Sequence, residues 1–455
     1  MHIPFASIAS YPVRRGNRVR PLVDGVPAFR RICEAVEAAR QSVWVTVAFL
    51  EEGFAMPDGR GSLFDVLDRA AARGVDVRAL FWRTNAESSF FDHEVFSGTA
   101  EHHALLAARG ARFHARWDRA QQAYCQHQKS WVIDAGASGE VAFVGGINLH
   151  VGSVVAPGHG GGPEDQAHDV YAELLGPAVT DVHHNFVQRW NEASERGLEG
   201  GAWPRAGTGD LAFPAKLSPE AGDAVVQIQR TVRAGHYTDG TATPGGSAFA
   251  IAEGETSIFE QYQRAIAAAR SSIYLENQAL GCPRTLEALH EALHRGVEVV
   301  VLTPANASPF MTAARKDPRS QAFFARFDAL AEHERFALVG LSAHGENGRR
   351  RPVYVHAKAA VIDDAWATIG SCNIGARSFF GDTELNATFW EPATARSLRV
   401  ELLREHLGVD TAALGDREAL ALYRERAGEN ARALAAGAEA EGIAVALDPR
   451  EYARA

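Results

Sequence analysis

Two short motifs in the chain combine histidine, lysine and aspartate at the same spacing. They lie in QHQKSWVIDAGASGEVAFVGGINL and in VHAKAAVIDDAWATIGSCNIGARSF, and they supply His127, Lys129 and Asp134, and His356, Lys358 and Asp363. Residues two apart on a β-strand point to the same face, so each histidine and its lysine are expected to share a pocket. An ammonium group beside an imidazole that titrates near neutrality can bind an anion and move a proton on it.

The scarcity of lysine makes a chance origin of these motifs implausible. The chain has only four lysines, Lys129, Lys216, Lys316 and Lys358, and two of them fall in the motifs. Both motifs fit H-x-K-x4-D, and both are followed by a second apolar segment and a turn of small residues that ends in Asn148 or Asn373. A single histidine on a strand is usually structural, but a repeated pattern of this kind indicates a functional site.

The residue types indicate chemistry on a phosphodiester. A catalyst for that reaction must neutralise the phosphate oxygens, supply a nucleophile and protonate the departing oxygen. The two lysines and the two turns with Asn148 and Asn373 can bind the oxygens. The two histidines can divide the other tasks, one attacking as neutral imidazole and the other acting first as an acid. This scheme predicts no metal and no other cofactor.

A nucleophilic imidazole also needs a partner that fixes its second nitrogen, most often a carboxylate. Asp169 follows the first motif in AHDVYAEL, and Glu384 follows the second in GDTELNATF. Asp134 and Asp363 lie seven residues beyond their histidines and therefore on the opposite strand face. We expect these two aspartates to be structural, holding a strand end or its turn.

The elements around the motifs repeat as well. EAVEAARQSVWVTVAFL and YQRAIAAARSSIYLENQAL both predict a helix followed by a strand, and LFDVLDRAAARGVDVRALFW and TLEALHEALHRGVEVVVLTP both predict a helix, a glycine and a strand. This order is typical of βαβ units. The sequence predicts an α/β fold of two pseudo-symmetric α/β/α units with mixed, mainly parallel sheets. A segment rich in Gly and Pro places the boundary near residue 215, giving halves 1–215 and 216–455.

Composition limits the class of protein. The 455 residues have a net charge of −10, which argues against extended binding to nucleic acid. No apolar run is long enough to cross a bilayer, and no signal peptide is evident, so a cytoplasmic or peripheral membrane location is expected. The four cysteines show no metal-ligand spacing and are expected to be structural. The segment after Thr411 is rich in alanine and predicts an amphipathic helix that packs on the second half.

At this point the residues resemble the phospholipase D superfamily. Besides the duplicated motif, three stretches resemble the plant and animal enzymes: HDVYAELLGPAVTDVHHNFVQRWNEAS, GETSIFEQYQRAIAAARSSIYLENQ and RSFFGDTELNATFW. The resemblance covers roughly residues 20–410. It implies that both motifs meet at one cleft, with His127 as nucleophile and His356 as general acid. It further implies that Lys129, Lys358, Asn148 and Asn373 bind phosphate, and that Asp169 and Glu384 orient the histidines.

The resemblance implies hydrolysis of phospholipid head groups with transphosphatidylation, through a phosphohistidine intermediate. The expected partners are a phospholipid at a membrane surface and water or an alcohol as acceptor, and the protein is expected to be a monomer. Loop side chains that can enter a lipid surface are Phe90, Phe91, Phe310, Met311, Phe379 and Phe380, unless they are buried in the core. The alternatives are a phosphatidyltransferase similar to cardiolipin or phosphatidylserine synthase, a nuclease, and an inactive phosphate-binding scaffold.

Overall fold

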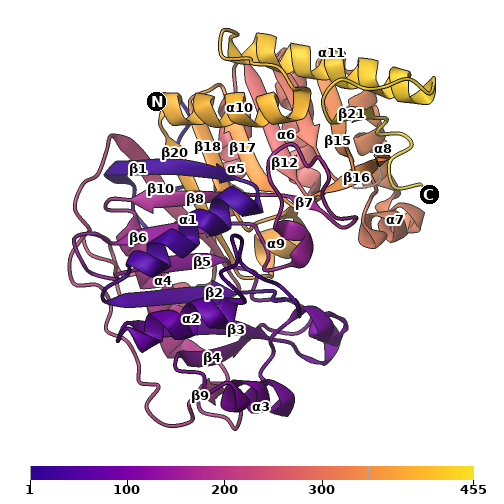
Figure 1. Cartoon of the computed structure of the whole chain (residues 1–455). Helices are drawn as coiled ribbons and strands as arrows, with labels where there is room; N and C mark the ends of the chain where they lie inside the picture. Colours follow the sequence, from indigo (N-terminus) through magenta and orange to yellow (C-terminus); the bar gives the residue numbers. More distant parts are fainter. Residues whose placement is uncertain (1, 346–347, 455) are drawn as a thin grey trace.

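The computed structural model describes residues 2–345 and 348–454, and it consists of two similar halves placed side by side (Figure 1). The helices of the first half are α1 (Gly25–Ala38), α2 (Leu63–Ala72), α3 (Ala100–Ala108) and α4 (Val179–Glu192), with 3₁₀ helices η1 (Ala86–Glu94) and η2 (Val151–Ser153). Its strands are β1 (Arg14–Val23), β2 (Ser42–Val47), β3 (Asp76–Arg83), β4 (His114–Arg119), β5 (Ser130–Ile133), β6 (Val141–Gly145), β7 (Ala167–His168), β8 (Val170–Leu175) and β9 (Ala202–Trp203).

The second half continues with the same kinds of element. Its helices are α5 (Ser257–Ala268), α6 (Pro283–His294), α7 (Pro309–Lys316), α8 (Gln321–Ala329), α9 (Ala376–Phe380), α10 (Pro392–Leu407) and α11 (Asp416–Ala435), with 3₁₀ helices η3 (Ile251–Glu253), η4 (Pro318–Ser320) and η5 (Leu330–Glu332). Its strands are β10 (Ala224–Val232), β11 (Glu255–Thr256), β12 (Ser272–Asn277), β13 (Leu280–Gly281), β14 (Glu298–Leu302), β15 (Phe336–His344), β16 (Arg350–Val355), β17 (Lys358–Ile362), β18 (Trp366–Gly370), β19 (Ile374–Gly375), β20 (Glu384–Trp390) and β21 (Ala444–Leu447).

The two sheets have the same strand order. In the first half the strands run β4-β3-β2-β5-β6-β8-β1, and in the second half they run β15-β14-β12-β17-β18-β20-β10. Within each set the first three strands are parallel and the remaining pairs are antiparallel. The motif strands β5 and β17 therefore occupy equivalent positions, each beside the first parallel strand of its half.

The repeated helix, glycine and strand form as the sequence predicts. Gly74 follows α2 and Gly296 follows α6, with φ of 85° and 84°, a left-handed backbone that favours glycine. β3 and β14 begin directly afterwards. At its start, α2 has a capping box in which Ser62 and Asp65 satisfy each other's backbone N–H groups. The glycine ends of α2 and α6 and the capped start of α2 allow β3 and β14 to begin where they join the parallel part of their sheets.

Strand β1 joins the two sheets. Its first residues, from Arg14 to Asn17, pair with β10, and the rest, from Arg18 to Val23, pair with β8. The residues before β1 also lie on the second half, where Ile3 is part of the core and its carbonyl accepts a hydrogen bond from Trp390 Nε1 at 2.9 Å. The boundary near residue 215 remains a prediction, and the chain crosses between the halves at its N-terminus as well.

Three core clusters support this arrangement. One lies between α1, α2 and the first sheet, and one lies between α5, α6 and the second sheet. The third is continuous across both halves and includes α4, α10, α11 and the inner faces of β6 and β18. Helix α11 is the one predicted after Thr411; it packs on the second half through Leu420 and Tyr423, and Figure 1 shows it in yellow along the outer side. The four cysteines are buried and free.

The α/β fold of two alike halves is confirmed. Its parallel part is smaller than the sequence predicted, because parallel pairing is limited to three strands in each half and to the two-residue pairs β7–β16 and β13–β19. After each motif strand the chain returns through a short loop, as from β17 to β18, and a connection this short can only join antiparallel strands. The sheets are therefore mixed, with antiparallel pairing on the side of the motifs.

Candidate active site

The two motif histidines lie in the short segments that lead into β5 and β17. The backbone N–H of His127 donates to the carbonyl of Thr383 at 3.0 Å, and the backbone N–H of His356 donates to the carbonyl of His168 at 2.9 Å. Each of these carbonyls belongs to the opposite half of the chain. Each histidine is thus held against the opposite half by its backbone, independently of its side chain.

The imidazole partners are exchanged between the halves in the same way. His127 Nδ1 lies 2.9 and 3.0 Å from the two carboxylate oxygens of Glu384, in the second half. His356 Nδ1 lies 2.6 Å from Asp169 Oδ2, in the first half. The sequence predicted that both carboxylates orient the histidines. In the structure each carboxylate contacts Nδ1 of the histidine that belongs to the other motif. Since both partners bind Nδ1, each Nε2 stays available for chemistry.

Both lysines are buried and directed by their own motif. Lys129 Nζ donates to the carbonyl of His127 at 2.8 Å, and Lys358 Nζ donates to the carbonyl of His356. Lys358 Nζ also donates to Gln278 Oε1 at 3.0 Å, whereas Lys129 Nζ lies 5.5 Å from the centre of the Phe49 ring. Each ammonium group keeps donor capacity beyond these contacts, because it carries three N–H bonds.

The two small-residue turns lie beside the carboxylates. Ser371 Oγ donates to Glu384 Oε2 at 2.5 Å, while Gly146 is at the matching place in the first turn. A Cβ atom at Gly146 would come within 2.4 Å of Asp169 Oδ1, so that position requires glycine. Asn148 Oδ1 and Asn373 Oδ1 are buried and have no hydrogen-bond partner among the residues that the structure describes. Unsatisfied polar atoms at equivalent points of two turns are suited to contact with a ligand.

Burial shapes the protonation of the site. It lowers the pKa of His356 to about 3, helped by the charge of Lys358, and it lowers the pKa of His127 well below the usual value, helped by Lys129 and then Lys358. Burial also lowers the pKa of Lys358 to about 7. Each histidine therefore responds to the lysine of the other motif as well as its own. The four groups share one electrostatic environment, in which both imidazoles are neutral until an anion enters.

The two carboxylates differ in their charge. Burial raises the pKa of Glu384 to about 7, and the nearby lysines only partly oppose this effect. Burial has the same tendency at Asp169, but the hydrogen bond from His356 and the positive charges outweigh it and lower the pKa of Asp169. Asp169 is thus the more firmly ionised partner, and it is better suited to stabilise a protonated imidazole.

The motif aspartates lie away from the site and bind backbone. Asp134 Oδ1 accepts the N–H groups of Arg40, Gln41 and Ser42 at 2.6–3.2 Å. Asp363 accepts those of Arg270, Ser271 and Ser272 at 2.8–2.9 Å, and it also binds His2. Both aspartates have positive φ, near 55°. They hold the start of the neighbouring strand, β2 or β12, in the same way in each half.

Sequence reasoning missed three contacts of the site. Phe49 packs edge-on against His127, with ring centres 6.0 Å apart, and Tyr354 stacks on His356 at 6.2 Å. Gln278 joins this wall, since its Nε2 donates to the Tyr354 hydroxyl at 2.7 Å. Gln278 directly follows β12, a strand that borders the motif strand β17. This position in the sequence could have indicated that Gln278 lies at the site.

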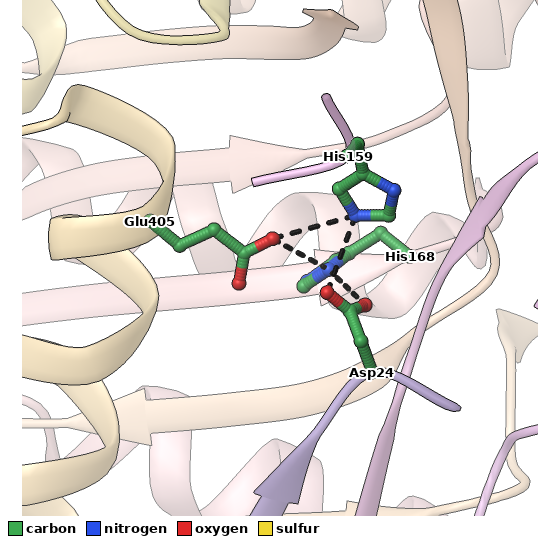
Figure 2. Close-up of side chains that lie close together, drawn as sticks. All are labelled: Asp24, His159, His168 and Glu405. Carbon is green, nitrogen blue, oxygen red and sulfur yellow. Dashed lines mark hydrogen bonds and ion pairs between the residues drawn. The ribbon is translucent and has the colours of Figure 1, made fainter. Parts of the chain in front are cut away.

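Behind His356 lies a cluster of four buried charged side chains, Asp24, His159, His168 and Glu405 (Figure 2). His168 Nδ1 lies 2.9 Å from Asp24 Oδ1, and His159 Nε2 lies 3.4 Å from Asp24 Oδ2 and 3.3 Å from Glu405 Oε1. Burial opposes the charge of His159, but Asp24 and Glu405 raise its pKa to about 9. The cluster therefore holds itself together by ion pairs and fixes the His168 carbonyl that binds His356.

The same cluster has the donors of a cation site. One ligand atom from each of the four residues lies within 4.8 Å of all the others, and the set contains two imidazoles and two carboxylates. Within residues 2–345 and 348–454, Asp24 Oδ2 and Glu405 Oε2 have no hydrogen-bond partner, although Asp24 Oδ2 forms the ion pair with His159. These residues can hold a divalent cation once both imidazoles lose their protons. The sequence predicted no metal, and the scheme for the two motif histidines needs none.

The aromatic side chains proposed for lipid contact divide into two groups. Phe90, Phe310 and Phe380 are exposed, at 52%, 71% and 45%. Phe379 is buried in the core between α5, α6 and the second sheet, and Phe91 packs against Phe49 and Trp82. Met311 is partly buried against the same core as Phe379. Among the helices of residues 2–345 and 348–454, none has the length and apolar composition needed to cross a bilayer.

Comparisons with known proteins identify the family of the chain. Residues 154–292 match the family model described as phospholipase D, and residues 262–405 match the one described as cardiolipin synthase, PLD-like domain. Phospholipase D alpha 2 of Oryza sativa subsp. japonica is 26% identical over 543 residues, covering 90% of this chain and 66% of the relative. Cardiolipin synthase A of Pseudomonas putida is 25% identical over 374 residues, covering 81% and 64%. The chain thus spans just under two thirds of the length of these relatives.

Among solved structures, the phosphatidylserine synthase of Haemophilus influenzae Rd KW20 has a similar fold. The TM-score is 0.57 with 11% sequence identity, over 88% of this chain and 87% of that chain. At this identity the likeness concerns the fold alone.

Proposed function

This chain belongs to the phospholipase D superfamily, and on that premise we propose that it cleaves the head-group phosphodiester of a phospholipid and passes the phosphatidyl group to water or an alcohol. The observation that carries the proposal is the crossed pairing of His127 with Glu384 and of His356 with Asp169. In this pairing each carboxylate contacts Nδ1 and not Nε2, and the charges of both lysines act on both imidazoles.

In the first step, His127 Nε2 attacks the phosphorus while Glu384 accepts the hydrogen bond from Nδ1–H. The bond from phosphorus to the head-group oxygen breaks, and His356 gives that oxygen a proton. Lys129 and Lys358 stabilise the charge on the non-bridging oxygens. Burial, helped by the two lysines, keeps His356 neutral in the free protein. The anionic phosphate offsets the charge of the lysines, so binding of substrate itself promotes protonation of the acid.

In the second step, water or an alcohol attacks the phosphohistidine. His356, now neutral, removes the proton of the attacking hydroxyl, the P–N bond breaks, and His127 returns to its free form. The difference between the carboxylates supports this division of roles. The firmly ionised Asp169 stabilises His356 as an imidazolium, whereas Glu384, with its pKa near 7, pairs with the histidine that starts neutral.

The substrate surface is proposed to be a lipid bilayer. Phe90 lies on η1 and contacts Phe91, which packs on Phe49 beside His127, so an exposed aromatic ring is joined to the wall of the pocket by two contacts. A ring in this place can enter the interface while a head group enters the site. The acceptor is then whichever hydroxyl compound reaches the pocket from the water side.

The test is a transfer assay on phosphatidylcholine vesicles with ethanol, in EDTA and in parallel with added Ca²⁺. Phosphatidylethanol and phosphatidic acid are the expected products, and their formation in EDTA would show that the chemistry needs no metal. Cleavage of plasmid DNA without any lipid product would instead indicate a nuclease. An absence of product from both substrates, with intact folding by circular dichroism, would contradict an enzymatic role.

A second candidate is transfer to a lipid alcohol. It is favoured by the match of residues 262–405 to the cardiolipin synthase model and by the cardiolipin synthases among the relatives. The same two steps apply, with the hydroxyl of phosphatidylglycerol as the attacking group. Vesicles of pure phosphatidylglycerol distinguish the two, because cardiolipin and glycerol would form in preference to phosphatidic acid if the lipid alcohol is the natural acceptor.

A further inference from the structure

Three histidines lie close together between α6 and the segment that leads into β15. His290 and His294 are one helical turn apart on α6, so they point to the same side of the helix. His333 follows η5 and faces them, with its ring centre 5.2 Å from that of His290 and 5.0 Å from that of His294. The group joins α6 to the segment that leads into β15.

The hydrogen bonds of His290 fix its tautomer. Its Nε2 lies 2.9 Å from the carbonyl oxygen of Arg326 and must donate to it, because a carbonyl only accepts. Its Nδ1 therefore carries a lone pair, and this atom lies 3.1 Å from His333 Nε2. A histidine whose second nitrogen donates to a backbone carbonyl has the usual arrangement of a metal ligand.

The separation of these two nitrogens also fits a shared metal ion. Two nitrogens bound tetrahedrally to zinc at about 2.0–2.1 Å lie about 3.3 Å apart. His294 is exposed at the end of α6 and forms no hydrogen bond or ion pair in the described part of the chain, so its side chain can rotate to bring a third nitrogen to the same point.

The group differs from the buried cluster near His356 in its charged partners. No carboxylate of the described residues forms an ion pair with any of the three histidines. Neutral imidazoles are the form that binds metal. This distinguishes the group from the cluster of Asp24, His159, His168 and Glu405, in which carboxylates pair with both histidines.

We propose that His290, His294 and His333 form a binding site for a late first-row divalent metal ion, with zinc as the best fit to three imidazoles and one water. The ion would replace the hydrogen bond between His290 and His333 by two metal–nitrogen bonds, and the proton of His333 Nε2 would move to His333 Nδ1. It would tie α6 to the start of β15 and so stabilise the second half. No step of the proposed phosphatidyl transfer involves it.

The test is calorimetric titration of zinc chloride into protein without a histidine tag, after treatment with EDTA and removal of the chelator. The wild type is expected to bind one equivalent of zinc that the double variant His290→Ala/His333→Ala lacks. His294→Ala, which loses no hydrogen bond, is expected to bind that equivalent at least tenfold more weakly. His344→Ala, at an exposed histidine of β15 in the same half, is the control and should titrate like the wild type.

Zinc held by the buried cluster behind His356 would appear in every variant, so the comparison separates the two places. The proposal is overturned if the wild type takes up no zinc at 100 µM, or if the double variant binds with the same stoichiometry and affinity as the wild type. A second measurement covers the case of a damaged variant: zinc should raise the melting temperature of the wild type and of His344→Ala, but less that of His294→Ala.

Discussion

The two motif regions share their backbone arrangement and differ in their chemistry. Asp134 and Asp363 each accept three backbone N–H groups, and Lys129 and Lys358 each donate to the carbonyl of the motif histidine. The parts that touch the reaction have diverged, with aspartate in one half and glutamate in the other, and with Gly146 in one turn and Ser371 in the other. The two halves thus keep their symmetry where they support strands and lose it where the proposed reaction requires two different proton transfers.

The largest expected effects separate the roles of the two histidines. His127→Ala and His356→Ala should each lower turnover of phosphatidylcholine by about 10⁴-fold or more. With phosphatidyl-p-nitrophenol, whose leaving group needs no acid, His356→Ala should still release one equivalent of p-nitrophenol and then stop, because only the second step needs its base. His127→Ala should release none. A burst in His127→Ala and none in His356→Ala would show instead that His356 is the nucleophile and His127 the acid.

The carboxylates test whether the pairing is crossed. Glu384→Gln should slow the p-nitrophenol burst, because Glu384 serves the nucleophile His127. Asp169→Asn should leave the burst nearly unchanged but slow turnover of phosphatidylcholine, since it serves the acid. Losses of about 10²–10⁴-fold are expected for a histidine that loses its orienting carboxylate. The opposite pattern, with each acid acting on the motif of its own half, would contradict the geometry.

The pH profile distinguishes Lys358 from the histidines. With the pKa of Lys358 near 7 in the free protein, its charge is present below pH 7 and lost above it. The value of kcat/KM should therefore fall about tenfold per pH unit above 7, since this ratio reports the free enzyme. The measurement is kcat/KM for the p-nitrophenyl substrate between pH 6 and 9. In Lys358→Met the activity should be low and the fall above pH 7 should disappear; a fall unchanged by this substitution would assign the titration elsewhere.

A smaller effect is expected at Gln278, which binds Lys358 and has no counterpart at Lys129. Gln278→Leu removes one hydrogen bond to a charged group, so kcat/KM should fall by about ten- to hundredfold, mainly through KM. Tyr354→Phe is the matched control, because it removes the hydroxyl bound to Gln278 Nε2 and keeps the bond to Lys358. An equal loss of kcat/KM in the two variants would show that the hydroxyl of Tyr354, and not the bond from Lys358 to Gln278, accounts for the effect.

The smallest difference between the halves is expected for the structural aspartates. Asp134→Asn and Asp363→Asn should each cost about 1–2 kcal/mol, because three backbone N–H groups lose a charged acceptor, while asparagine tolerates the positive φ. Melting temperatures by circular dichroism should fall by a few degrees to a similar extent in both. Activity per folded molecule should be unchanged. A large loss of activity without a change in melting would place these aspartates in the chemistry.

Much of the fold could be predicted from local sequence patterns. The helix, glycine and strand around Gly74 and Gly296 follow from capping and alternation, which depend on neighbouring residues alone. The exchange of Asp169 and Glu384 could not be predicted, because it depends on how the halves dock and each acid follows its own motif in the sequence. The cluster of Asp24, His159, His168 and Glu405 comes from distant segments with no spacing in common. The catalytic roles themselves remain predictions that the variants above address.

The crossed pairing has a consequence for the order in which activity can arise during synthesis. His127 precedes Glu384 by 257 residues, so the proposed nucleophile emerges from the ribosome long before the carboxylate that contacts its Nδ1 exists. A chain interrupted before Glu384 would therefore carry an intact first motif without that carboxylate. On the proposed mechanism, attack on a phospholipid must wait until β20 is in place.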